Sequence, residues 1–178
     1  MQFSVAPTIS HLIQIGPILK PNKKPIEGHN AFRKLGLMST WRKKIETAYD
    51  IVARKVWMPG DYQGGFKKKR SCIGRAFIIC ASIDWCRHNG YKLWMGLMID
   101  YSCYFDTFNQ AILLKKMKQI ETPELLRRAV FRSKAEEVYQ VRMKNAVGTK
   151  VKVAKGAAQG GGFSPWKGLA VADCIAAA

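Results

Sequence analysis

Polar and apolar residues alternate in two runs, Glu137 to Lys144 and Thr149 to Lys155, on either side of the short segment from Asn145 to Gly148. Alternation with a period of two is typical of a β-strand, and a short turn between two such runs joins them as an antiparallel hairpin. Most of the other long segments show helical periodicity instead. A chain that combines this hairpin with several helices is predicted to have an α+β fold.

The first helix is predicted between residues 39 and 57. Ser39 or Thr40 can cap its start, and Pro59 and Gly60 stop it after about Trp57. We expect one apolar face of this helix to be buried. That face consists of Trp41, Ile45, Ala48, Tyr49, Val52 and Val56.

The middle of the chain is predicted to form a buried helix and a buried strand. Ser71 can open a second helix that reaches about Arg87, and this helix is apolar nearly all round, which predicts burial. The segment from Tyr91 to Asp100 is predicted to be a strand that ends in its acid. Asp106 is expected to cap the helix that follows.

The two ends of the chain differ in pattern. Residues 1–37 hold short apolar runs broken by Gly and Pro, which predicts short strands and loops. A further helix is expected to start at Thr122-Pro123-Glu124, and a last one at Ser164-Pro165. The last helix is apolar on most faces, so we expect its apolar surface to be buried against another protein, with packing on the chain's own hairpin as the alternative.

The chain is strongly basic, with 30 Lys and Arg against 12 Asp and Glu and a net charge of +18 over 178 residues. This excess favours an anionic partner such as nucleic acid, although a membrane surface would attract it too, and many charge runs are simply solvated. No run of about 18 apolar residues occurs, so we expect no membrane-spanning helix and no membrane partner.

The five cysteines are scattered, without a Cys-x-x-Cys pair, and their number is odd. This predicts buried free thiols rather than a disulfide framework or a zinc site. The first residues do not form a convincing secretory signal. We therefore expect a reducing intracellular compartment, with the mitochondrial matrix as one candidate.

Two segments contain residues suited to binding a metal ion or an anion. IDYSCYFDTFN, residues 99–109, has Asp100 at the end of the predicted strand, where a carboxylate must be paired, hydrogen-bonded or bound to metal. QGGGFSP, residues 159–165, is a glycine-rich turn into a helix, and such a turn lets the backbone approach an anion. Each segment alone also fits an ordinary strand end or an ordinary turn.

In this order, with a hairpin between them, the two segments resemble reverse transcriptases of the non-long-terminal-repeat retroelement and group II intron type. Further blocks are similar to the same family: IGPILKPNKKP (15–25), HNAFRKLGLMST (29–40), YQGGFKKKRS (62–71) and FDTFNQAILLKKMKQI (105–120). The resemblance covers roughly residues 12–176. It implies the fingers and a partial palm of a right-hand polymerase fold, with an N-terminal arm and fingers-like region over 1–92 and a palm-like region over 93–178.

The resemblance also implies roles for individual residues. Asp100 would be a metal-binding catalytic acid, Phe105 the gate that excludes a ribose 2′-hydroxyl, and Gln159 a contact of the incoming nucleotide or template. Arg33 and Lys20 would contact the triphosphate. The remaining nucleotide- or RNA-binding candidates are Lys67, Lys68, Lys69, Arg70 and Gly160.

Catalysis in this family uses two metal ions held by several carboxylates. The family's Asp-Asp turn follows the Gln-Gly helix and has no counterpart in this sequence, so Asp100 alone would not hold two Mg²⁺ ions. The sequence also departs from the family at several motif positions. These are Lys34, Gly64, Lys67, Cys103, Ala157-Ala158 and Trp166-Lys167-Gly168.

We therefore expect a retroelement-derived, reverse-transcriptase-like RNA-binding protein that is catalytically inactive on its own. It would be a structural component of a ribonucleoprotein such as a ribosome, would need no cofactor, and would bind rRNA or another structured RNA. Its helix from Ser164 to Ala178 would contact protein subunits. The alternative is a fragment or split half of an active RNA-directed DNA polymerase that uses Mg²⁺. An RNA chaperone or maturase-like splicing factor is a third possibility.

Overall fold

A computed structural model of the chain describes residues 11–92, 94–96 and 103–176, except for the side chains of residues 27, 29, 30, 175 and 176. The chain forms two compact units. Unit 1 comprises Met1–Met58 and Cys103–Ala178, and unit 2 comprises Pro59–Ser102. Unit 1 therefore joins residues before 59 to residues after 102 in one sheet and one core. The predicted division into a fingers-like and a palm-like region at residue 92 stays a prediction.

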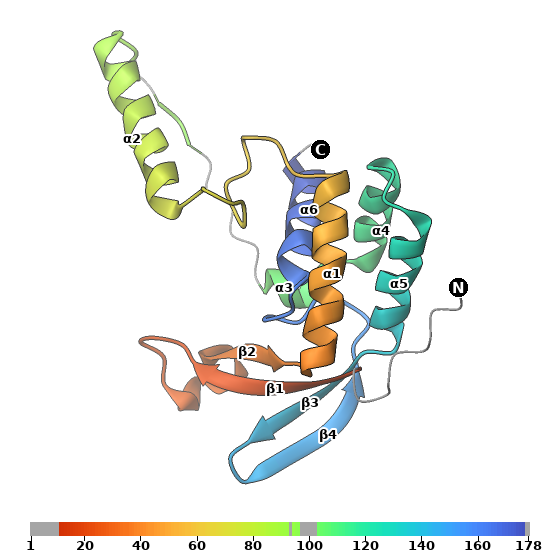
Figure 1. Cartoon of the computed structure of the whole chain (residues 1–178). Coiled ribbons are helices and arrows are strands. Elements are labelled where there is room, and N and C mark those ends of the chain that lie inside the picture. Colours follow the sequence, from red (N-terminus) through yellow and green to blue (C-terminus); the bar gives the residue numbers. More distant parts are fainter. Residues whose placement is uncertain (1–10, 93, 97–102, 177–178) are drawn as a thin grey trace. The chain divides into compact units, whose positions relative to one another are not determined.

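Unit 1 contains a four-stranded mixed sheet in the order β2-β1-β3-β4 (Figure 1). Strand β1 (Leu12–Leu19) pairs with β2 (Phe32–Leu37) in antiparallel orientation and with β3 (Val138–Met143) in parallel orientation. Strands β3 and β4 (Ala146–Lys152) form the predicted hairpin, with a tighter turn than expected. A 3₁₀ segment, η2 (Pro25–Ala31), lies between β1 and β2.

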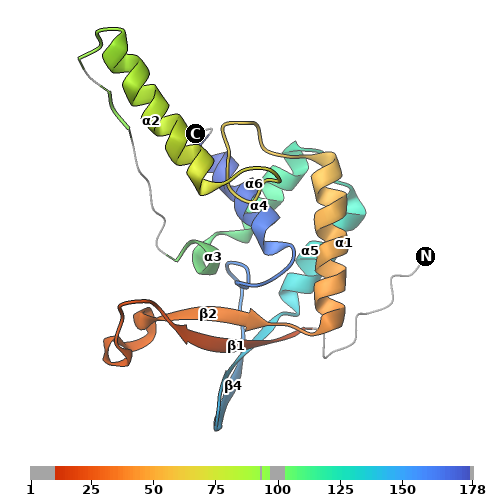
Figure 2. The same ribbon diagram turned by 60° about the vertical axis from the view of Figure 1, so that its left-hand side comes forward.

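Five α-helices of unit 1 accompany this sheet, so the α+β class is confirmed. They are α1 (Thr40–Val56), α3 (Tyr104–Thr107), α4 (Gln110–Gln119), α5 (Glu124–Ala135) and α6 (Ser164–Ala176). Figures 1 and 2 show these helices on one side of the sheet. The other side carries none of the helices that the structure describes in this unit.

Side-chain caps explain where two of the helices begin. The Ser39 hydroxyl accepts a hydrogen bond from the Arg42 amide at 3.2 Å, which confirms the predicted start of α1. Helix α4 is instead capped by Asn109, whose side chain accepts from the Ala111 amide at 2.8 Å. The prediction that Asp106 caps this helix is wrong, because Asp106 lies inside the short helix α3.

The core of unit 1 is built on α6. The rings of Phe163 and Trp166 stack with centroids 5.0 Å apart, and Trp57 of the segment after α1 meets Trp166 edge-on. Leu113 and Met117 of α4 are fully buried in the same cluster. The apolar face of the last helix is therefore covered by helices of its own unit, and its predicted contact with another protein stays a prediction.

Helix α1 buries a different face from the predicted one. Its buried residues are Arg42, Glu46 and Ala53, whereas Trp41 is 66% exposed and Val52 is 43% exposed. The prediction followed the apolar side chains. The fold instead places two oppositely charged side chains inside, where each finds a partner.

Unit 2 consists of a loop and the helix α2 (Cys72–His88). Ser71 caps this helix as predicted, with its hydroxyl accepting from the Gly74 amide at 3.1 Å. The predicted burial is wrong within this unit, because no residue of α2 is buried. The described residues that follow, 91, 92 and 94–96, form no strand, and Asp100 lies outside the described residues.

Two further predictions concern the cysteines and membrane-spanning helices. All five cysteines are free, but Cys72, Cys80 and Cys103 are exposed rather than buried. In the part of the chain that the structure describes, no helix is both long enough and apolar enough to cross a membrane.

Candidate nucleic-acid interface

The turn that contains Gln159 and Gly160 runs alongside the edge strand β2. The Gly36 amide donates to the Gln159 carbonyl at 2.7 Å, and Leu35 and Gln159 form an isolated parallel bridge. The contact at Gly36 is tight, since an added Cβ would lie 3.1 Å from the Gln159 carbonyl oxygen. The glycine-rich segment and the second strand, 120 residues apart in sequence, are therefore held together by backbone contacts.

Helix α3 holds the start of the same turn. The Ala157 amide donates to the Phe105 carbonyl at 2.6 Å, and the Gly156 amide donates to the Phe108 carbonyl at 2.9 Å. The half-buried Phe105 ring meets the Tyr104 ring edge-on, with centroids 5.5 Å apart. The structure thus joins the segments of two predicted site residues, Phe105 and Gln159, through one turn.

Lys34 completes this arrangement from β2. Its ammonium forms an ion pair with the Asp106 carboxylate at 3.2 Å. The sequence marked Lys34 only as a departure from the family, and Asp106 only as a cap. Their opposite charges are the one sequence signal for this pair, because Lys34 follows the predicted site residue Arg33 and Asp106 follows the predicted site residue Phe105.

Arg33 and Lys20 do not join this group in the predicted way. Side chains alternate along β2, so Arg33 points to the face of the sheet opposite to that of Lys34 and Gly36. Arg33 is exposed and forms no ion pair among the described residues. Lys20 lies beyond the end of β1, where its amide donates to the Ala31 carbonyl at 2.8 Å.

The amino-terminal end of α6 was expected to be open to an anion, but a carboxylate of the chain itself lies there. Glu46 Oε2 accepts from the Phe163 amide at 3.4 Å. A Cβ on Gly161 would lie 2.7 Å from the same oxygen, so glycine is required for this close approach. The Ser164 hydroxyl donates to the Ala158 carbonyl at 2.8 Å. The site for a phosphate is therefore occupied by Glu46.

Glu46 belongs to a buried cluster of charges, which we call the ion cluster. Arg42 Nε donates to Glu46 at 2.8 Å, Arg42 Nη2 donates to Glu137 at 3.1 Å, and Lys134 Nζ donates to Glu137 at 3.1 Å. All four side chains are at most 5% exposed. Burial alone would lower the pKa of Arg42, but the charges and hydrogen bonds of Glu46 and Glu137 outweigh it and raise that pKa.

Lys167 of α6 is the fifth member of the ion cluster. It is 6% exposed, and no carboxylate lies within ion-pair distance of its ammonium among the described residues; its contact there is the Phe163 ring, 5.4 Å from the centroid. Burial lowers the pKa of Lys167, while Glu46 and Glu137 act in the opposite direction. The cluster thus holds three cations against two carboxylates, and it supports the sheet from the helical side.

The basic loop of unit 2 divides into residues that hold the loop and residues that face solvent. Lys67 Nζ donates to the carbonyls of Pro59 and Gly60 at 2.9 and 3.0 Å, and Arg70 pairs with Asp61 at 2.6 Å. Hydrogen bonds from Arg70 and then Lys67 lower the pKa of Asp61. Lys67 and Arg70 therefore have structural partners in this loop.

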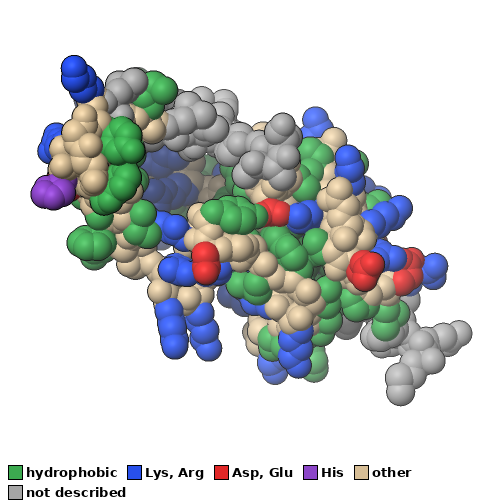
Figure 3. All heavy atoms as spheres, turned by 90° about the horizontal axis from the view of Figure 1, so that it is seen from above, with side chains coloured by type: hydrophobic (Ala, Val, Ile, Leu, Met, Phe, Trp, Pro, Cys, Tyr) green, Lys and Arg blue, Asp and Glu red, His purple; other side chains and the backbone are tan. Residues whose placement is uncertain are grey.

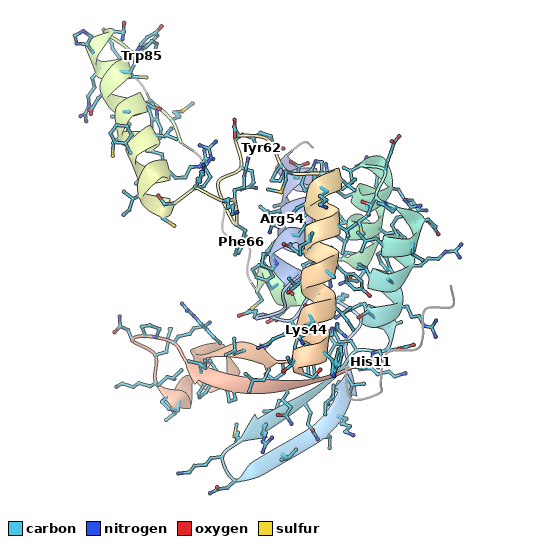
Figure 4. All side chains as sticks on the ribbon, viewed as in Figure 1. His11, Lys44, Arg54, Tyr62, Phe66 and Trp85 are labelled. Atoms are coloured by element: carbon cyan, nitrogen blue, oxygen red, sulfur yellow. The ribbon has the colours of Figure 1, made fainter. Side chains whose placement is uncertain are left out.

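Lys68 and Lys69 are exposed on the same loop and form no ion pair in the described part of the chain. Figure 4 shows Tyr62 and Phe66 on this loop and Trp85 on α2, and all three side chains are more than half exposed. Aromatic rings beside exposed cations are the combination with which proteins stack single-stranded bases. Unit 2 thus carries a second candidate surface.

Asp100, the predicted metal ligand, lies outside the described residues. Among the residues that are described, no three His, Cys, Asp or Glu side chains lie close enough to hold a metal ion. The roles predicted for Phe105 and Gln159 in nucleotide binding stay predictions.

No protein-family model matches the chain, and no curated protein matches it. Its function is therefore inferred from its own residues and their geometry.

Proposed function

We propose that this chain is a reverse-transcriptase-like RNA-binding protein of retroelement origin that serves as a structural component of a ribonucleoprotein. A ribosome is the first candidate for that particle. On its own the chain binds RNA and does not transfer nucleotides. Its fold would correspond to fingers and a partial palm.

One observation supports RNA binding above all: nearly all described acids form ion pairs with basic residues of the chain itself. Within the described residues, every Asp and Glu side chain except Glu121 forms an ion pair with Lys, Arg or His. Lys and Arg outnumber Asp and Glu by 30 to 12 in the whole chain, so the net charge of +18 is a surplus of basic side chains that the acids of the chain cannot neutralise. Basic side chains recur over the face shown in Figure 3, with few acidic ones between them. Such a surplus is the electrostatic footprint of a nucleic-acid-binding protein.

Two contacts support the absence of catalysis. Glu46 lies against the start of α6, where a bound phosphate would be repelled by the carboxylate. Asp106, next to the predicted gate Phe105, is neutralised by Lys34. Both contacts involve residues beside the motifs on which nucleotide binding would depend.

RNA binding is tested by fluorescence anisotropy with labelled RNA between 50 and 200 mM salt. If about six phosphates are contacted, the logarithm of the affinity should fall with the logarithm of salt concentration with a slope of roughly −4 for a single strand. A parent chain that binds no RNA at 50 mM salt would refute the proposal.

The alternative, an active polymerase, is favoured by the joining of the Phe105 and Gln159 segments through one turn. Primer extension on an RNA template with Mg²⁺ or Mn²⁺ distinguishes the two. We expect no incorporation. Template-dependent incorporation that disappears in Asp100→Asn would establish the polymerase instead.

A further inference from the structure

The side of the sheet that faces away from the helices carries cations and no acids. We call this side the open face. Its polar side chains follow from the strand register and the alternation of side chains. They are Gln14, Arg33, Gln140, Arg142, Lys150 and Lys152.

Three contacts or pairings place these residues on one side. Arg142 Nη1 donates to Gln14 Oε1 at 3.2 Å, so β1 and β3 present these two side chains to the same face. Gln140 is paired with both Gln14 and Lys150 in the register. The buried Ile13 and Ile15 alternate with Gln14 and face the helices.

The charge of the open face has one sign. None of the four strands contains Asp or Glu. Arg33, Arg142, Lys150 and Lys152 are exposed and form no ion pair among the described residues. Neighbouring strands lie roughly 4.8 Å apart, so these cations extend over roughly 14 Å from one edge strand to the other. Along the strands, Arg33 beside Ile18 and Lys152 in register with Leu12 are offset by roughly 20 Å. An extended anion matches this arrangement better than a small one.

The open face also lacks the groups that read single-stranded bases. The aromatic residues within its strands are Phe32 and Tyr139, and both alternate to the helical side, where Tyr139 is paired with the buried Ile13. A surface without aromatic platforms cannot stack splayed bases. Exposed apolar side chains also lie on this face, namely Ile18, Leu35, Leu37 and Val147. Its polar groups offer phosphate contact through Lys and Arg, and Gln14 and Gln140 supply amide groups of the kind that bond 2′-hydroxyls. Shape and charge readout of this kind is how proteins bind double-stranded RNA.

We propose that the open face binds the backbone of duplex RNA, without sequence preference, through Arg33, Arg142, Lys150 and Lys152. This inference rests on the proposed function and names both the RNA class and the surface. It differs from the surface of unit 2, where Tyr62, Phe66 and the exposed lysines suit single strands.

The test compares three versions of the full chain on a 20-base-pair RNA duplex and on one of its single strands. The open-face variant is R33Q/R142Q/K150Q/K152Q. The matched control is K43Q/K55Q/K115Q/K118Q, which removes the same charge from exposed lysines of α1 and α4. At 100 mM salt we expect the open-face variant to lose at least about tenfold in duplex affinity and the control less than about threefold.

Folding is checked by urea unfolding of each variant. A smaller variant, K150Q/K152Q, changes only exposed residues of the edge strand β4 and is expected to show about half of the effect on the logarithmic scale. If the parent binds duplex RNA and both open-face variants bind it equally well, the open face is not the site, and RNA binding itself still stands. If the open-face variants lose affinity only for the single strand, the open face is likewise not the duplex site, and RNA binding still stands. A parent that binds neither probe would overturn both proposals.

Discussion

The ion cluster gives the sharpest prediction about stability. Glu137 is 2% exposed and accepts hydrogen bonds from Arg42 and Lys134, each at 3.1 Å. Glu137→Gln would leave three buried cations against the single carboxylate of Glu46. Because removing one partner of a buried ion pair leaves an uncompensated charge, we expect a loss of about 3 kcal/mol in the free energy of unfolding.

Lys167→Met should have the opposite effect. It removes the cation that burial penalises and leaves two cations against two carboxylates. We expect this variant to be neutral or more stable than the parent by up to about 1 kcal/mol. In the Lys167→Met background, Glu137→Gln should then cost about 1 kcal/mol less than in the parent, since the two sites are coupled.

The assay is urea unfolding of the four proteins of this cycle, followed by circular dichroism and by tryptophan fluorescence, to which the buried Trp166 contributes from unit 1. Glu136→Gln is the matched control, because Glu136 is 38% exposed and its ion pairs with His11 and Arg132 lie nearer the surface. It should cost less than about 1 kcal/mol. A cost of Glu137→Gln no larger than that of this control would contradict the role of Glu137 in the ion cluster. Additive changes in the free energy of unfolding for Glu137→Gln and Lys167→Met would contradict their coupling.

Two further outcomes are expected from the same unfolding measurements. Gly156→Ala should cost about 3 kcal/mol or more, because φ is 66° and an added Cβ would lie 2.4 Å from the Phe105 carbonyl oxygen. Gly28→Ala, with φ of 72°, ψ of −154° and no atom within 4 Å, should cost only the backbone strain of about 1 to 3 kcal/mol, and a cost equal to that of Gly156→Ala would contradict the crowding at Gly156. Raising the pH from 8 to 10 should stabilise the parent relative to Lys167→Met. The pKa of Lys167 is lowered in the fold, so the unfolded chain binds more protons between that value and about 10.4. A difference that does not change with pH would show that the folded state does not perturb this lysine.

The local elements were predictable where a single residue type determines them. The hydroxyls of Ser39 and Ser71 cap their helices by accepting a hydrogen bond from the amide three residues later. The β3–β4 hairpin follows from the alternation of apolar and polar residues with a period of two. Local capping and alternation need no knowledge of distant residues. The start of α6 at Ser164-Pro165 was predictable because proline is favoured in the first turn of a helix.

Burial was less predictable, because it depends on partners far away in the sequence. Arg42 is buried because Glu137 reaches it across 95 positions, and no pattern within α1 reveals this partner. The parallel pairing of β1 with β3 likewise joins residues more than 120 positions apart. The open face depends on that pairing, so its four cations could not be assembled from the sequence, although each of them was visible as a basic residue.

The salt dependence of duplex RNA binding tests the central claim most directly, because it counts the phosphates that the open face neutralises. The slope of the logarithm of affinity against the logarithm of salt is measured for the parent, the open-face variant and the control variant. Each phosphate contact contributes about 0.9 to this slope in duplex DNA, so removing Arg33, Arg142, Lys150 and Lys152 should make it shallower by about 3 to 4. The control should change it by less than about 1. Equal slopes for the parent and the open-face variant would contradict the account.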